Sequence, residues 1–136
     1  MLPASSTEKG QCVAFPDVCK TPAGPVVVPV PYPNMAQLNQ TKMPTASQTV
    51  FLVGKNAVTE NTEITMSSGD EAGAIGGVIS GTIKGPCKFK LGSSVVFIEG
   101  YAAAYCGSMI GHNGNNNNAP LGTQVAPSQN KVFVSP

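Results

Sequence analysis

Residues 47–64 read SQTVFLVGKNAVTENTEI, and residues 93–110, which lie 46 positions later, read SSVVFIEGYAAAYCGSMI. Eight aligned positions hold identical or similar residues, including a Val-Phe-aliphatic triplet and the glycine two positions after it. Valine and phenylalanine favour strands, and glycine permits a tight turn at positive φ. We therefore interpret 47–64 and 93–110 as repeated hairpin units, which predicts a mainly β fold.

The composition agrees with many short strands and turns. The chain of 136 residues contains 15 glycines and 12 prolines, and both residue types destabilise helix interiors. Its length is that of one ordinary domain. We expect a single domain over residues 1–136 with at most one or two short helices.

The segments that flank the first repeat carry weaker patterns. Prolines and a glycine interrupt residues 1–24, which we interpret as an extended, irregular N-terminal segment. Residues 25–33 (PVVVPVPYP) alternate valines with prolines, which predicts an edge strand or a polyproline-like strip. Asn34 suits the cap of one helical turn over 35–40. The C-terminal residues 131–134 (KVFV) predict one further strand that closes the sheet.

Two other segments are poor in regular structure. Residues 67–85 are rich in glycine and alanine, which predicts either a short helix capped near Asp70 or a tightly packed backbone crossing. Residues 113–119 contain a run of asparagines with little to bury, so we expect an exposed Asn-rich loop there.

The charge and hydropathy of the chain argue against several classes of partner. Charged residues make up 11% of the chain and the net charge is +1, which gives no electrostatic footprint for nucleic acid. The longest apolar runs, 26–30 and 95–98, fall far short of the roughly 18 residues of a membrane span. The first residues also lack the pattern of a signal peptide, so we expect synthesis in the cytoplasm.

The four cysteines and the single histidine are the candidate ligands and redox groups: Cys12, Cys19, Cys87, Cys106 and His112. Three interpretations stay open, namely zinc ligands, buried free thiols and disulfides. The spacings C-x5-H and C-x6-C lie outside the usual clusters of zinc fingers and do not favour metal by themselves.

The sequence gives little support for catalysis. Asp70 and Glu71 are adjacent and have no histidine near them in sequence, so a capping or solvated role is favoured over acid-base chemistry. Ser93 and Ser94 lack the flanking pattern of a nucleophile elbow. We expect no enzyme activity, and we rank a small hydrolase that uses His112 last.

The second repeat resembles a known family. In proteins with the proline-alanine-alanine-arginine (PAAR) repeat, a glycine and a variable residue precede the four-letter motif, and a Gly-Asp step and a histidine follow it. The corresponding run here is Gly100 to Ser108 (GYAAAYCGS), followed by His112. Both alanines of the motif are present, while Ala102, Tyr105 and Ser108 replace its proline, arginine and aspartate.

Further blocks, taken in chain order, resemble the divergent PAAR-like branch of this family. They are FPDVCKTP at 15–22, VPVPYPN at 28–34, GDEAGAIGG at 69–77 and KGPCKFKLG at 84–92. Together with the second repeat they extend the resemblance over about residues 10–114. Agreement in order across most of the chain makes these weak blocks specific when taken together.

The resemblance implies a cone-shaped β structure that caps a trimeric, β-helical VgrG-type spike, with one tip per trimer. It also implies a structural function: sharpening the spike of a type VI-like or other contractile injection system for membrane puncture, and offering an attachment surface to a separate effector or toxin chain. Such a protein is exported on the spike. The alternative from another class is a secreted or surface β-rich binding domain with two disulfides.

Members of the PAAR family bind zinc near the apex of the cone through histidines and a cysteine. The resemblance therefore implies His112 as a ligand, with Cys106, Cys19 and either Cys87 or Cys12 completing the set.

Overall fold

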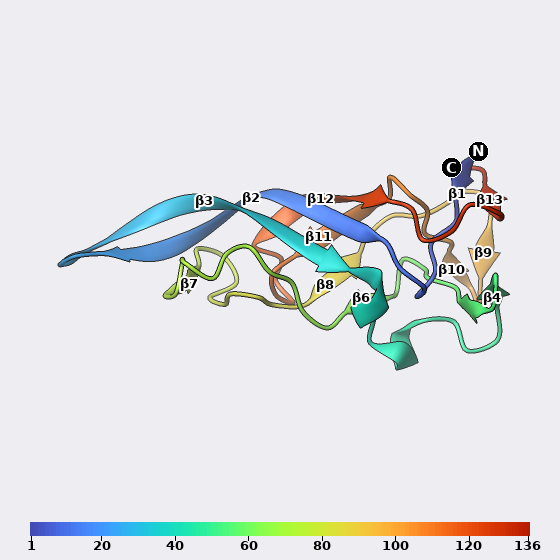
Figure 1. Ribbon diagram of the computed structural model, residues 1–136, viewed down its shortest axis with the longest axis horizontal. Coiled ribbons are helices and arrows are strands. Elements are labelled where there is room, and N and C mark those ends of the chain that lie inside the picture. The colour runs from blue at the N-terminus through green and yellow to red at the C-terminus, as the bar shows by residue number, and fades with distance from the viewer.

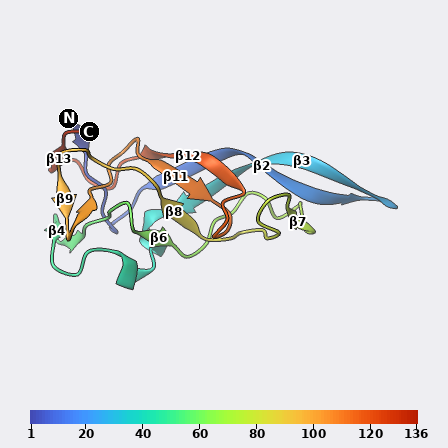
Figure 2. The same cartoon turned by 180° about the vertical axis from the view of Figure 1, so that it is seen from behind.

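The computed structural model describes all residues, 1–136, and shows an elongated, mainly β molecule. Figure 1 shows that it tapers from a broad end, where both termini lie, to the tip of one long hairpin, and Figure 2 shows the same taper from behind. The predicted β class and cone shape are therefore confirmed.

The long hairpin consists of β2 (Gln11–Ala23) and β3 (Val26–Gln37), which pair in antiparallel register from Ala23 opposite Val26 down to Gln11 opposite Gln37. It forms one side of a sheet with the strand order β3-β2-β12-β11-β8-β6, and β7 pairs with β2 beside this path. The other strands are β6 (Glu63–Ile64), β7 (Gly76–Gly77), β8 (Cys87–Phe89), β11 (Met109–His112) and β12 (Ala119–Ala126).

The structure corrects the interpretation of residues 1–24 as irregular, because most of this segment is β2. Prolines do not interrupt the strand when their positions need no ladder hydrogen bond. A bulge between Ala14 and Asp17 absorbs Pro16, and Pro22 lies opposite Val27 close to the turn. The prediction that 25–33 is an edge strand is confirmed, since β3 lies at the end of the sheet order.

Helical structure is limited to two 3-10 turns, η1 (Leu38–Gln40) and η2 (Met43–Thr45), as the prediction of at most two short helices requires. The prediction that Asn34 caps a helical turn over 35–40 is wrong, because η1 begins after Gln37. Asn34 belongs to β3, and its side-chain amide donates to Ser67 Oγ at 2.8 Å. None of the helical segments has the length and hydropathy that crossing a membrane would require.

The two sequence repeats each form a small hairpin at the broad end. The first pairs β4 (Phe51–Leu52) with β5 (Lys55–Asn56), and the second pairs β9 (Phe97–Ile98) with β10 (Tyr101–Ala102). Each turn consists of a residue and a glycine that both have positive φ, Val53-Gly54 and Glu99-Gly100. Positive φ at both turn positions matches the twist of the flanking strands.

A third strand pair matches these hairpins except that no turn connects its strands, because it joins the two ends of the chain; we count it as the third hairpin of this end. It pairs β1 (Leu2–Pro3) with β13 (Phe133–Val134). The C-terminal strand predicted over 131–134 therefore exists, but it pairs with the N-terminus and not with the main sheet.

Residues 67–85 contain no helix, and the alternative of a tightly packed crossing is confirmed. A Cβ at Gly73 would lie 2.3 Å from Cys19 Cβ, and one at Gly77 would lie 2.4 Å from the side-chain amide of Asn118. The loop predicted over 113–119 is confirmed, but only its centre, Asn115 and Asn116, is exposed, because Asn113 and Asn118 are buried. Their amide groups satisfy backbone groups of neighbouring loops, which an apolar side chain could not do.

The hydrophobic core lies where the main sheet meets the broad end. It contains nine buried residues: Cys12, Ala36, Leu38, Val58, Ile64, Cys87, Phe89, Ala104 and Ile110. A smaller cluster, formed by Ala57, Ile98 and Ala103, packs between the two repeat hairpins. The core is small, and buried polar side chains fill much of the narrowing part of the cone.

Candidate functional site

The three small hairpins form a closed ring at the broad end. The residue that follows each hairpin by two positions donates its backbone N–H to the matching residue of the next unit: Ser5 to Ala104 O at 2.9 Å, Ala104 to Val58 O at 3.0 Å, and Val58 to Ser5 O at 3.0 Å. Isolated β-bridges repeat the cycle, as Ala4 pairs with Tyr105, Ala103 with Thr59, and Ala57 with Ser6. This end of a single chain therefore has approximate three-fold symmetry. We call it the ring end.

The three units share their internal hydrogen bonds as well. A side-chain oxygen accepts the N–H three positions later in each unit, at 2.9 Å from Val50 to Ser47, 2.9 Å from Val96 to Ser93 and 2.7 Å from Val132 to Gln129. The same three valines accept, through their carbonyl oxygens, the N–H of the equivalent alanines Ala57, Ala103 and Ala4, each at 3.0 Å. Ser93 is thus a turn cap, which gives its hydroxyl a structural role.

Small residues occupy the crowded positions of the ring. Ala4, Ala57 and Ala103 hold equivalent positions and are at most 1% exposed. A larger side chain at these buried positions would crowd the segments that hydrogen-bond to one another in the ring.

Each hairpin of the ring end presents one phenylalanine at the same position. Phe51, Phe97 and Phe133 are 55%, 60% and 44% exposed, respectively. Scattered apolar side chains are normal on protein surfaces, but three large aromatic groups related by approximate three-fold symmetry form a patterned surface. This pattern marks the ring end as a candidate interface.

Polar contacts hold neighbouring units of the ring together. The Glu99 carboxylate, at the turn of the second hairpin, accepts hydrogen bonds from Ser47 Oγ and from the backbone N–H and hydroxyl of Thr49, at 3.1 and 2.8 Å for the latter two. These hydrogen bonds lower the pKa of Glu99 to about 2, and the hydrogen bond from Ser47 has the largest effect.

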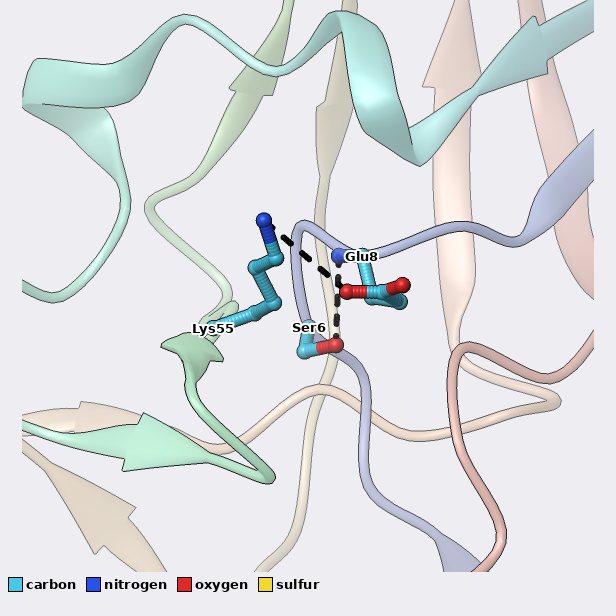
Figure 3. A network of polar contacts seen from close by, with 3 residues as sticks. All are labelled: Ser6, Glu8 and Lys55. Carbon is cyan, nitrogen blue, oxygen red and sulfur yellow. Dashed lines mark hydrogen bonds and ion pairs between the residues drawn. The ribbon is translucent and has the colours of Figure 1, made fainter.

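A weaker contact joins the N-terminal unit to the first hairpin. Lys55 Nζ lies 4.0 Å from Glu8 Oε2, and the Glu8 N–H donates to Ser6 Oγ at 3.3 Å; Figure 3 draws both contacts as dashed lines. Both charged side chains are about half exposed, so this ion pair adds little to stability.

A second candidate site lies inside the cone and consists of Asp17, Cys19 and Asp70. All three residues are buried, and one ligand atom from each lies within 4.8 Å of the other two. Cys19 Sγ lies 3.6 Å from Asp17 Oδ1. The Oδ2 atoms of both aspartates have no hydrogen-bond partner, although a buried oxygen without a partner is costly. The group can hold a metal ion, which would satisfy both oxygens.

The amide groups of two asparagines position this cluster. Asn113 Nδ2 donates to Asp17 Oδ1 at 3.2 Å and to Thr82 O at 2.8 Å, and Asn118 Nδ2 donates to Val18 O at 2.8 Å. Asp70 Oδ1 accepts the backbone N–H of Lys84 at 3.0 Å. The carboxylates are therefore fixed on one side, and their free oxygens are left for another partner.

Burial favours the neutral forms of two of these groups in the absence of a metal. It raises the pKa of Asp70 to about 7, and the neighbouring Asp17 side chain raises it further. It also raises the pKa of Cys19 to about 12, with the charge of Asp17 as the next cause. A bound cation would have the opposite effect, because a nearby positive charge favours the ionised carboxylate and thiolate.

The structure brings only one of the ligands predicted from the sequence, Cys19, into this group. Cys106 lies at the ring end, where its N–H donates to Pro3 O at 2.8 Å and its Sγ lies 3.7 Å from Gln124 O. Cys87 lies on β8 with its Sγ 4.0 Å from Gly85 O, and Cys12 belongs to the hydrophobic core. All four cysteines are free thiols.

His112 is completely buried, and neither ring nitrogen has a hydrogen-bond partner. Burial lowers its pKa to about 4. No hydrogen bond joins the imidazole to the Ser93 hydroxyl that the hydrolase hypothesis would need, because that hydroxyl donates to Ser135 O.

Two features of the candidate sites were not predicted from the sequence, namely the third hairpin and Asp17. The third hairpin escaped because its strands lie at opposite ends of the chain, although 132–134 (VFV) matches the triplets of the other two units. Asp17 escaped because it carries no motif. Its position two residues before Cys19 on one strand, which places both side chains on the same face, was the available signal.

Comparison with protein families matches residues 10–119 to the family described as Toxin PAAR-like domain. No curated protein and no solved structure matches the chain. The family match covers most of the chain. The protein belongs to the Toxin PAAR-like domain family.

Proposed function

We propose that this protein is a structural spike-tip protein whose ring end caps the trimeric VgrG-type spike of a type VI-like contractile system. One observation carries the proposal, namely the approximate three-fold ring of hairpins built from a single chain. A spike made of three identical chains ends in a surface with three-fold symmetry, and only a partner with matching symmetry can contact all three chains equivalently.

The chemistry of the ring end fits such a contact. The end of a β-helix exposes unpaired strand edges, which pair with other chains unless they are covered. The ring end offers three strand pairs, and each carries an exposed phenylalanine at the same position. Aromatic side chains are enriched in the buried centre of stable interfaces. The tapering main sheet then extends the spike to a narrow end (Figure 1).

The test is co-expression with the trimeric spike protein of the same organism, followed by size-exclusion chromatography with mass measurement. We expect a complex of one tip with three spike chains. Each of the variants Phe51→Asp, Phe97→Asp and Phe133→Asp should weaken it at least tenfold, because a charge would be buried in the contact.

The matched control is Leu121→Asp, which places the same charge on β12, where the side chain is 71% exposed and lies outside the ring. It should leave the mass of the complex unchanged. Failure of the wild-type protein to bind the spike, or equal loss with Leu121→Asp, would contradict the proposal.

We assign the attachment of a separate effector chain to an apolar recess on the side of the cone. An open cavity of about 360 Å³ lies there, and it is lined by Phe15, Pro16, Val18, Val78, Ile79, Asn118, Pro120 and Leu121. Leu121→Asp should therefore abolish effector co-purification while the spike complex persists.

We also propose that the group of Asp17, Cys19 and Asp70 binds one zinc ion. A thiolate and two carboxylates are ligands that Zn²⁺ accepts, and the two aspartate oxygens without partners support a cation at this position. Bound there, zinc would link β2 to the loop of residues 67–85 in a part of the cone that has little hydrophobic core.

Metal analysis by mass spectrometry of the purified protein tests the zinc proposal. We expect one equivalent of zinc, its loss in Asp70→Asn, and a lower melting temperature of the wild-type protein after treatment with a chelator, because metal binding stabilises the folded state. Absence of zinc together with a melting temperature that the chelator does not change would contradict it.

A further inference from the structure

The far end of the β2–β3 hairpin, residues 21–29 (TPAGPVVVP), carries no charged residue. We call this segment the hairpin end. Figure 1 shows that it projects beyond the rest of the molecule. Its side chains are not packed on a core, since Val26, Val27 and Val28 are 57%, 54% and 40% exposed. The narrow end of the cone is therefore an uncharged, apolar projection.

Both faces of the hairpin end are apolar. Successive residues of a strand point to opposite faces, so Val26 and Val28 lie on one face and Val27 lies on the other. A protein partner that packed against one face would leave the other face in water. A lipid phase, by contrast, surrounds an inserted hairpin and contacts both of its faces. Apolar side chains on both faces therefore fit insertion into lipid better than docking on a protein.

The backbone of the hairpin end directs few N–H groups outward, which suits an environment without water. Met35 points its N–H away from β2 and donates to Ser68 O at 2.7 Å. Alternation along β3 gives the same outward orientation to residues 33, 31, 29 and 27. The first three of these are prolines, which have no N–H.

The opposite edge of the hairpin end, on β2, also lacks an outward-facing N–H group. Pro22 lies opposite Val27 in the register and therefore also points outward. Among the outward-facing strand positions of the hairpin end, Val27 alone has an N–H. Unsatisfied N–H and C=O groups both exclude open strand edges from hydrocarbon, and the prolines lower this cost here because they leave only the carbonyl oxygens without partners.

We propose that the hairpin end enters the outer leaflet of a lipid bilayer. Lys20 is exposed directly behind it and would keep its ammonium group at the level of the lipid headgroups. The three residue pairs beyond the pair of Lys20 with Pro29 reach about 10 Å, whereas the hydrocarbon core is about 30 Å thick. The hairpin end therefore inserts without spanning, and it needs no anionic lipid because it carries no charge.

This inference deepens the proposed function, since puncture is the step at which a spike tip meets a membrane. It depends only on residues 21–29 and not on the ring end. It can therefore be tested with the isolated protein, and failure of the test leaves the docking of the ring end to be judged by its own experiment.

The chain contains no tryptophan, so one substitution introduces a single fluorescent reporter. Val27→Trp places it at the hairpin end, and Phe133→Trp places the control at the opposite end of the molecule. With vesicles of pure phosphatidylcholine, we expect the emission of Val27→Trp to move to shorter wavelength and to be quenched by lipids with brominated acyl chains. The emission of Phe133→Trp should not change.

Adding Val26→Asp to the Val27→Trp protein should abolish the shift, because a carboxylate is costly in hydrocarbon. Three results would overturn the proposal: no shift of Val27→Trp at the highest lipid concentration, equal shifts of the two reporters, or a shift that requires anionic lipid. The last two would indicate adsorption without insertion of the hairpin end.

Discussion

At the scale of single residues, the turns of the ring contain two non-glycine residues with positive φ, Val53 and Glu99. Val53 is β-branched and has a φ of 52°, a conformation that such residues avoid. The equivalent position of the second hairpin holds Glu99, whose carboxylate is used in hydrogen bonds to the neighbouring unit. Val53 is exposed and makes no such hydrogen bond, so its side chain is retained at a cost in stability.

Val53→Asn should therefore stabilise the protein by about 1 kcal/mol, because asparagine tolerates positive φ and Asn-Gly is the preferred sequence of this turn. Urea unfolding measures the difference. Val95→Asn is the control, since Val95 is also exposed, at 63% against 51% for Val53, but is not among the residues with positive φ. Its effect on the free energy of unfolding should be much smaller, and equal effects would refute the explanation.

The Glu99 carboxylate makes the ring sensitive to acid. Its pKa in the folded protein is about 2, below the ordinary value of 4.5, so the ionised form stabilises the fold. This stabilisation is complete above pH 4.5 and is lost as the pH falls toward 2.

Thermal unfolding of the wild-type protein and of Glu99→Gln tests this pH dependence. The difference in melting temperature between the two proteins should be largest at neutral pH and should shrink as the pH falls through this window. A difference that is independent of pH would exclude the carboxylate as its source.

The candidate metal site shows which of its residues a sequence can predict. Cys19 was predicted as a ligand because cysteine is a metal-binding residue wherever it occurs. Its actual neighbours, Asp17 and Asp70, are 53 positions apart in sequence and meet only because β7 and its loop fold against β2. No local pattern encodes the contact with Asp70, so the predicted set of ligands could not include it, whereas Asp17 had a local signal in its position two residues before Cys19.

At the scale of elements, the repeat predicted two hairpins correctly because each one is encoded within six consecutive residues. The long hairpin was harder to predict, since its prolines imitate the signal of a loop. Their spacing of two residues, at 29, 31 and 33, is the period of a strand and places all of them on its free edge. The same prolines prevent that edge from pairing with another chain.

Restoring the missing N–H groups should therefore promote self-association. The double variant Pro29→Thr and Pro31→Thr gives the free edge of β3 two donors, and we expect dimers or larger species whose amount rises with concentration in light scattering. Val30→Thr is the control, because residue 30 directs its N–H toward β2. A double variant that stays as monomeric as the control would show that the prolines do not protect this edge.

At the scale of the whole molecule, the two ends have different chemistry. The broad end carries three aromatic residues in a ring stabilised by polar contacts, and the narrow end is an uncharged hairpin with few free backbone donors. The cone shape followed from the family resemblance. The closed ring could not be predicted in this way, because it needs β1 and β13, which lie outside residues 10–119.

The central claim is that the ring end, and not the hairpin end, docks on the spike. Hydrogen exchange measured by mass spectrometry on the free protein and on its spike complex tests it directly. We predict slower exchange at β4–β5, at β9–β10 and at β1 with β13, and unchanged exchange at residues 21–28. Protection of residues 21–28 with no change in the three hairpins of the ring would contradict the account.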